Sequence, residues 1–74
     1  MNPYEAIIKM NEAERDVKFN QLISIYNMIE KENEDHGPDA SYEMKKKYQN
    51  RIDSLRDRIE KLDNKIKLYL AMND

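Results

Sequence analysis

The chain has 74 residues, of which 38% are charged and 39% hydrophobic, with a net charge of −2 and no cysteine. This composition excludes a disulfide framework and a thiolate metal site, and no apolar run approaches the roughly 20 residues that a membrane-spanning helix needs. With one glycine and two prolines, it is typical of long helices and coiled coils. We therefore expect a cytoplasmic, all-α protein that forms a single domain over residues 1–74 and carries no cofactor or metal.

The first predicted helix covers about residues 3–35. Asn2 is a natural N-cap, and Pro3 is tolerated in the first turn because its missing N–H has no helical partner there. Gly37 and Pro38 must interrupt the helix, since glycine suits a left-handed C-cap and proline excludes α conformation in the residue before it. A turn at 36–39 is the expected result, with Asp39 or Ser41 capping the next helix.

The second predicted helix covers about residues 40–72 and carries a regular heptad pattern. Its apolar residues alternate at spacings of four and three, as a helix that packs along one partner requires. The residues of this seam are Tyr48, Ile52, Leu55, Ile59, Leu62, Ile66 and Tyr69. The pattern therefore predicts a partner helix of similar length.

The first helix is the expected partner, folded back as an antiparallel hairpin in which facing positions add up to about 77. Five apolar residues would then face the seam: Ile8, Phe19, Leu22, Tyr26 and Ile29. Glu12 and Arg15 would form two polar rungs that weaken the open end and help to fix the register. Charge favours the same pairing, because residues 1–39 carry a net charge of −5 and residues 40–74 a net charge of +3.

A further set of apolar residues in the first helix is not used by this pairing. An apolar band wider than one neighbour can cover indicates a second contact, so we expect two hairpins to dimerise into a four-helix bundle, or another protein to take the same place. The expected partner-binding residues are Tyr4, Ile7, Met10, Val17, Met28 and Tyr42. These tyrosines are included because tyrosine combines a large contact area with a polar tip.

The sequence therefore predicts a small intracellular interaction module, a homodimer that binds another protein and modulates or inhibits it, as accessory proteins of bacteria and phages do. Nucleic-acid binding is the alternative, through the basic residues Lys45, Lys46, Lys47 and Arg51. Catalysis is not expected, because two helices with a single glycine offer no concave site for a catalytic set. His36, the only histidine, follows Glu34 and Asp35 but lacks the i, i+4 ligand pairing of helical metal sites.

Overall fold

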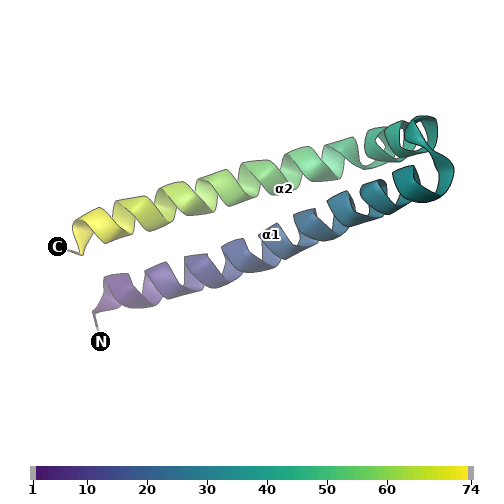
Figure 1. Cartoon of the computed structure of the whole chain (residues 1–74). Helices are drawn as coiled ribbons and strands as arrows, with labels where there is room; N and C mark the ends of the chain where they lie inside the picture. Colours follow the sequence, from purple (N-terminus) through teal and green to yellow (C-terminus); the bar gives the residue numbers. More distant parts are fainter. Residues whose placement is uncertain (1, 74) are drawn as a thin grey trace.

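The computed structural model describes residues 2–73 and contains two helices, α1 (Pro3–His36) and α2 (Pro38–Met72). They run antiparallel and side by side, so Asn2 and Asn73 lie at the same end of a rod measuring 52 × 17 × 14 Å (Figure 1). The prediction of an all-α, antiparallel two-helix hairpin is confirmed. Within the described residues, neither helix contains a stretch long and apolar enough to cross a membrane.

The open end of the hairpin is held by contacts between its first and last described turns. The side-chain oxygen of Asn2 accepts a hydrogen bond from the Tyr4 N–H at 2.9 Å, which is the predicted N-cap. The Asn2 side-chain amide also donates to Asn73, and the rings of Tyr4 and Tyr69 lie 6.0 Å apart between centroids. Aromatic contact thus joins α1 to α2 where the seam ends.

The turn between the helices is a single residue, Gly37, and is shorter than the expected segment 36–39. Gly37 has φ +90° and ψ 178°, a conformation that only glycine adopts without strain. Its N–H donates to the Asn33 carbonyl at 2.9 Å, and its own carbonyl accepts from the Ser41 N–H at 3.2 Å. Pro38 opens α2 directly, because its fixed φ and missing N–H suit a first helical position.

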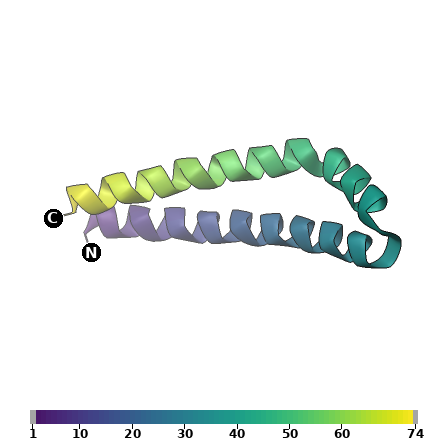
Figure 2. The ribbon, with the colours of Figure 1, turned by 45° about the horizontal axis from the view of Figure 1, so that its top comes forward.

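The expected side-chain cap of α2 is not formed. Gly37 occupies the N-cap position, and the Ser41 hydroxyl donates instead to the Pro38 carbonyl at 2.9 Å. Ser41 also bonds the Asn33 side chain at 3.2 Å and so ties the first turn of α2 to the last turn of α1. Figure 2 shows these first turns of α2 inclined to the rest of the helix, which then follows α1.

The core lies along the predicted seam of α2, but the stripe of α1 that packs against it differs from the predicted one. Leu22, Ile25, Ile52 and Leu55 form a buried cluster, against which half-buried Ile29, Tyr48 and Ile59 pack. Ile8, Leu62 and Ile66 continue the seam toward the open end. On α2 all seven predicted heptad residues lie in this seam, and Leu62 has no exposed surface.

Three of the predicted seam residues of α1, Glu12, Phe19 and Tyr26, lie one position away from the seam. Phe19 and Tyr26 are 50% and 41% exposed, whereas Ile25, expected beside the seam, is buried. The predicted and the observed seam of α1 share Ile8, Arg15, Leu22 and Ile29, and at the positions between these four they differ by one residue. The helix is rotated so that Ile25 faces Ile52 and the two rings lie on one side of the seam.

We expect Leu62→Ala to destabilise the hairpin by about 2–5 kcal/mol, because it removes a fully buried side chain from the seam. Leu68→Ala is the matched control, since it removes the same atoms from the same helix at a position that is 55% exposed. It should change stability by less than about 0.5 kcal/mol. Urea denaturation followed by circular dichroism measures both, and equal losses would contradict the observed rotation of α2.

Gly37→Ala should cost about 1–3 kcal/mol, because an L side chain is strained at φ +90°. The loss would come from the backbone alone, since a Cβ at Gly37 meets no atom within 4 Å. A synthetic chain with D-alanine at position 37 is the control, because a D residue adopts positive φ readily. Thermal unfolding should show D-alanine at least as stable as glycine; a loss as large as that caused by L-alanine would refute the backbone explanation.

Candidate interaction surface

The seam changes character near the middle of α1. The heptad that contains Ile8, Leu22 and Ile25 places Asn11, Arg15 and Lys18 at the intervening seam positions, and all three polar side chains are partly buried. This part of the seam faces Leu62 on α2, and the hydrocarbon stems of arginine and lysine suit such a place because their charged ends still reach water.

Arg15 is fixed by an ion pair across the helices. Its guanidinium donates to the Asp63 carboxylate at 3.0 Å and also lies 3.7 Å from Asp16. The hydrogen bond to Asp63 raises the pKa of Arg15. Asp63 lies beside the α2 seam, so the pair holds the register at the point where apolar contact from α1 is weakest. It is a structural element of the hairpin.

The heptad divides the rest of the surface into two broad sides, one on each side of the seam. On one side, α2 has a stripe of six positions, of which five carry cations and one is Ser54. The neighbouring stripe of α1 carries four apolar residues. We call this side the basic face: Lys47, Arg51, Arg58, Lys61 and Lys65 from α2, and Ile7, Met10, Val17 and Met28 from α1.

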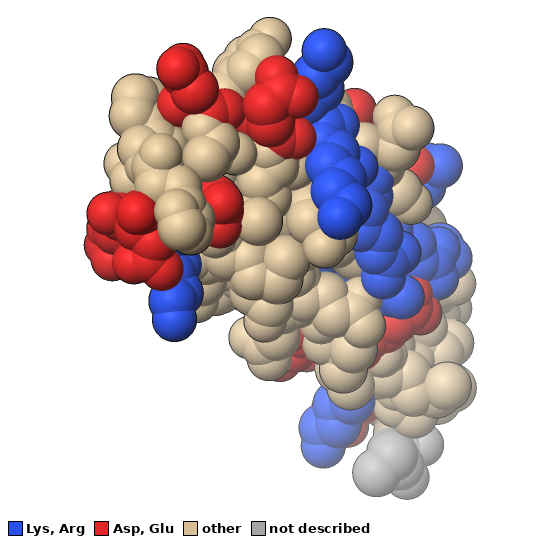
Figure 3. Space-filling model, turned by 90° about the vertical axis from the view of Figure 1, so that its right-hand side faces the viewer, with Lys and Arg blue, Asp and Glu red and all other residues tan. Residues whose placement is uncertain are grey.

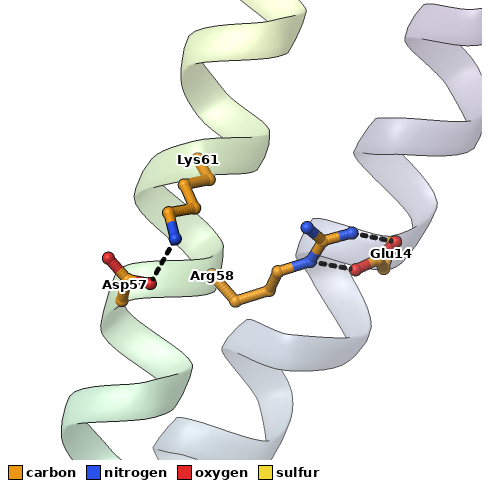
Figure 4. A network of polar contacts seen from close by, with 4 residues as sticks. All are labelled: Glu14, Asp57, Arg58 and Lys61. Atoms are coloured by element: carbon orange, nitrogen blue, oxygen red, sulfur yellow. Dashed lines mark hydrogen bonds and ion pairs between the residues drawn. The ribbon is translucent and has the colours of Figure 1, made fainter.

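Two of these cations bridge the helices. Arg58 donates to both carboxylate oxygens of Glu14, at 2.6 and 3.0 Å, and Arg51 donates to the Gln21 side chain at 3.0 Å. Figure 4 shows Arg58 reaching from α2 to α1, while Lys61 pairs with Asp57 at 3.0 Å within its own helix. The bridging hydrogen bond lowers the pKa of Glu14 and raises that of Arg58. The basic face is therefore held in place on both helices.

The opposite side of the seam is acidic on α1. A stripe with the same spacing has carboxylates at its ends and three exposed apolar side chains between them. We call it the acidic flank: Glu12, Asp16, Phe19, Ile23, Tyr26 and Glu30. A shallow groove beside it is lined by Phe19, Leu22 and Ile59 together with charged residues of α2. Viewed from the turn, basic side chains gather along one side and acidic ones mainly along the other (Figure 3).

The partner-binding residues predicted from the sequence fall mostly on the basic face. Met10 is 73% and Val17 54% exposed, Met28 is also exposed, and Ile7 is half-buried. Tyr42 is exposed near the turn. Tyr4 is half-buried at the opposite end of the rod, where part of its ring contacts Tyr69, so these two tyrosines do not join the others in one patch.

The predicted nucleic-acid residues do not form one patch either. Consecutive helical positions point about 100° apart, so Lys45, Lys46 and Lys47 fan around α2. Only Lys47 and Arg51 lie in the basic stripe, and the Lys47 ammonium lies 5.6 Å from the centroid of the Tyr48 ring. The continuous cationic surface comes instead from Arg58, Lys61 and Lys65. The sequence does not single out these residues, because the run of three lysines is its more conspicuous basic segment.

The exposed area shows that the hairpin leaves much of its surface uncovered. It exposes 5602 Å², whereas a compact monomer of its 8.9 kDa mass exposes about 4,800 Å². The excess of about 800 Å² reflects the elongated shape of the rod, in which each helix packs against one neighbour. Within residues 2–73, no three histidine, aspartate or glutamate residues are grouped so that they could hold a metal ion.

Comparison with known proteins adds no assignment: no protein-family model, no curated protein and no solved structure matches this chain.

We expect the bridge between Glu14 and Arg58 to make the stability of the hairpin depend on pH. Because the folded-state pKa of Glu14 is lowered from 4.5, its contribution to stability is present above pH 4.5 and is lost as the pH falls through the lowered value. The melting temperature of wild type should exceed that of Glu14→Gln near neutrality, and the difference should vanish in acid. The side chains of Arg58 and Glu14 are 41% and 39% exposed, so solvent screens the pair and the effect is small.

Asp57→Asn provides the control for this experiment. It removes an ion pair of the same face that lies within α2 and bridges no helices. Circular dichroism melts of the three chains from pH 7 to pH 2 measure the effect. A difference between wild type and Glu14→Gln that persists unchanged at the lowest pH would show that the bridge does not contribute in this way.

Proposed function

We propose that the protein is a cytoplasmic interaction module that binds a helix of another protein on its basic face and thereby modulates or inhibits it. The observation that carries the proposal is the exposed apolar stripe of α1 beside the cationic stripe of α2. The module acts by contact and performs no catalysis. The comparison with bacterial and phage accessory proteins is an analogy of size and architecture.

The chemistry of the basic face specifies the kind of partner it would accept. Met10 and Val17 offer apolar contact area, and methionine adapts to different partner shapes because its thioether chain is flexible. Lys61 and Lys65 lie alongside, so a suitable partner helix presents acidic residues next to an apolar stripe. This is the helix-in-groove mode of recognition, with charge selecting the partner and apolar burial supplying affinity.

Self-association belongs to the same proposal. One helix pair covers a single stripe of each helix, which leaves large apolar side chains such as Met10, Val17 and Phe19 exposed. A second hairpin packed against the first would complete a four-helix arrangement in a homodimer.

Nucleic-acid binding is the second candidate, favoured by the length of the cationic stripe. Lys47 and Lys65 are 18 residues apart, which is about 27 Å along the helix. A row of cations on this scale attracts phosphates irrespective of base sequence and would give binding that falls steeply with salt. The exposed apolar residues beside the row are not explained by phosphate binding, so protein binding is preferred.

Replacing Met10 and Val17 together by lysine should reduce partner binding by at least about tenfold, because two charges would enter the apolar contact. Partners are captured from a host lysate with the tagged protein after nuclease treatment, and affinity is then measured by calorimetry with the purified partner. The matched control is Asn20→Lys with Asn27→Lys, which adds the same charge to the exposed edge of α1 away from the seam. The control should bind like wild type.

We expect both variants to keep the helicity of wild type in circular dichroism, because the replaced side chains lie on the surface and not in the core. Capture of the same protein by both variants at wild-type affinity would refute the proposed face. Recovery of nucleic acid alone, lost on nuclease treatment, would favour the second candidate instead.

A further inference from the structure

The basic face would suit a helix that carries acidic and apolar residues along one side. The acidic flank makes α1 such a helix. We infer that copies of this chain associate by laying the acidic flank of one copy on the basic face of the next, so that two different surfaces meet. The inference rests on the proposed function, because it fills the same basic face. It identifies a second copy as the occupant and states the orientation of the contact.

The lengths and spacings of the two stripes agree. The acidic flank runs from Glu12 to Glu30 and the cationic stripe from Lys47 to Lys65, so each spans 18 residues, or about 27 Å. Both follow the same alternation of four and three residues along a helix. Stripes of equal period and length stay in contact along their whole extent when two helices pack side by side.

The charges match position by position when the two stripes run in opposite directions. Glu12 then faces Lys65, and Asp16 faces Lys61. At the other end, Glu30 faces Lys47. None of the six facing positions of the two stripes brings like charges together. Complementary potentials of this kind select the partner and fix the register.

The middle of the contact is complementary in shape and polarity. Phe19 falls opposite Arg58, and Tyr26 falls opposite Arg51, while Ile23 faces Ser54, the one small residue of the cationic stripe. Arginine is favoured against aromatic rings because its planar group stacks on them and is weakly hydrated. The bridges to Glu14 and Gln21 hold the two arginines in extended positions across the hairpin, ready for this contact.

A contact between two different surfaces has a consequence that a twofold dimer lacks. Each added copy leaves one basic face and one acidic flank free, so association continues beyond two copies unless the geometry closes into a ring, of which the homodimer is the smallest. A separate partner protein with an acidic helix would compete with the next copy for the basic face. Self-association and partner binding would then exclude each other at that face.

The test reverses the charges of two facing pairs, Glu12 with Lys65 and Asp16 with Lys61, which lie toward the open end of the hairpin. One variant carries Glu12→Lys and Asp16→Lys on the acidic flank, and the other carries Lys61→Glu and Lys65→Glu on the basic face. Sedimentation velocity over a range of concentrations should show association of wild type and at least about a tenfold weaker association of each variant. An equimolar mixture of the two should recover wild-type association, because the two intact surfaces match each other and so do the two reversed surfaces.

A chain with all four reversals is the matched control, since its two surfaces are again complementary; it should recover wild-type association. A wild-type chain that stays monomeric at sub-millimolar concentration would overturn the inference. So would one double variant that associates normally by itself, because that result would show a contact between two identical surfaces. Circular dichroism confirms that each variant remains helical.

The failure of this inference can be distinguished from failure of the proposed function. The variant with Glu12→Lys and Asp16→Lys changes no residue of the basic face. Binding of a separate partner protein by this variant, without self-association of wild type, would retain the proposed function and reject the self-contact. Self-association that follows the predicted pattern, without any separate partner, would support the self-contact alone.

Discussion

Each helix of this hairpin has one neighbour, and the remaining structure follows from that constraint. A helix can bury only a narrow stripe against a single partner, so the seam is one residue layer thick. Among residues 2–73, the buried residues are correspondingly few, and all of them are aliphatic. The rest of each helix is left to solvent or to other molecules, whatever its composition. Large exposed apolar side chains such as Met10 and Phe19 are a direct result.

The seam itself is uneven, and this unevenness defines the hairpin. Near the turn, aliphatic side chains from both helices meet in the buried cluster around Leu22 and Leu55. Toward the open end, α2 remains aliphatic while α1 contributes Arg15 and Lys18. The ion pair between Arg15 and Asp63 and the bridge from Arg58 to Glu14 lie in this half. Polar contacts at such exposed positions add little stability, but they restrict the register in which the two helices pair.

The two sides of the seam differ because the heptad separates residues that are adjacent in sequence. A run such as Lys45-Lys46-Lys47 points in three directions, whereas Lys61 and Lys65 combine with more distant residues into one stripe. The charge difference between the halves of the chain thereby becomes a difference between two faces of one rod. Both proposals depend on this arrangement, since a basic face suits an acidic helix and α1 carries an acidic stripe on the other side of the seam.

The sequence by itself determined the two helices, their antiparallel pairing and the seam of α2. It did so because the α2 heptad is unbroken and because Gly37 and Pro38 leave a helix no way to continue. Only the tertiary structure decided which stripe of α1 faces that seam, since α1 has two stripes at heptad spacing and its apolar residues are spread over both. In the observed rotation, Ile25 enters the core while Arg51 and Arg58 reach Gln21 and Glu14. The basic face and the acidic flank depend on that rotation, and a pattern along one helix cannot specify it, because the rotation is fixed by contacts with the other helix.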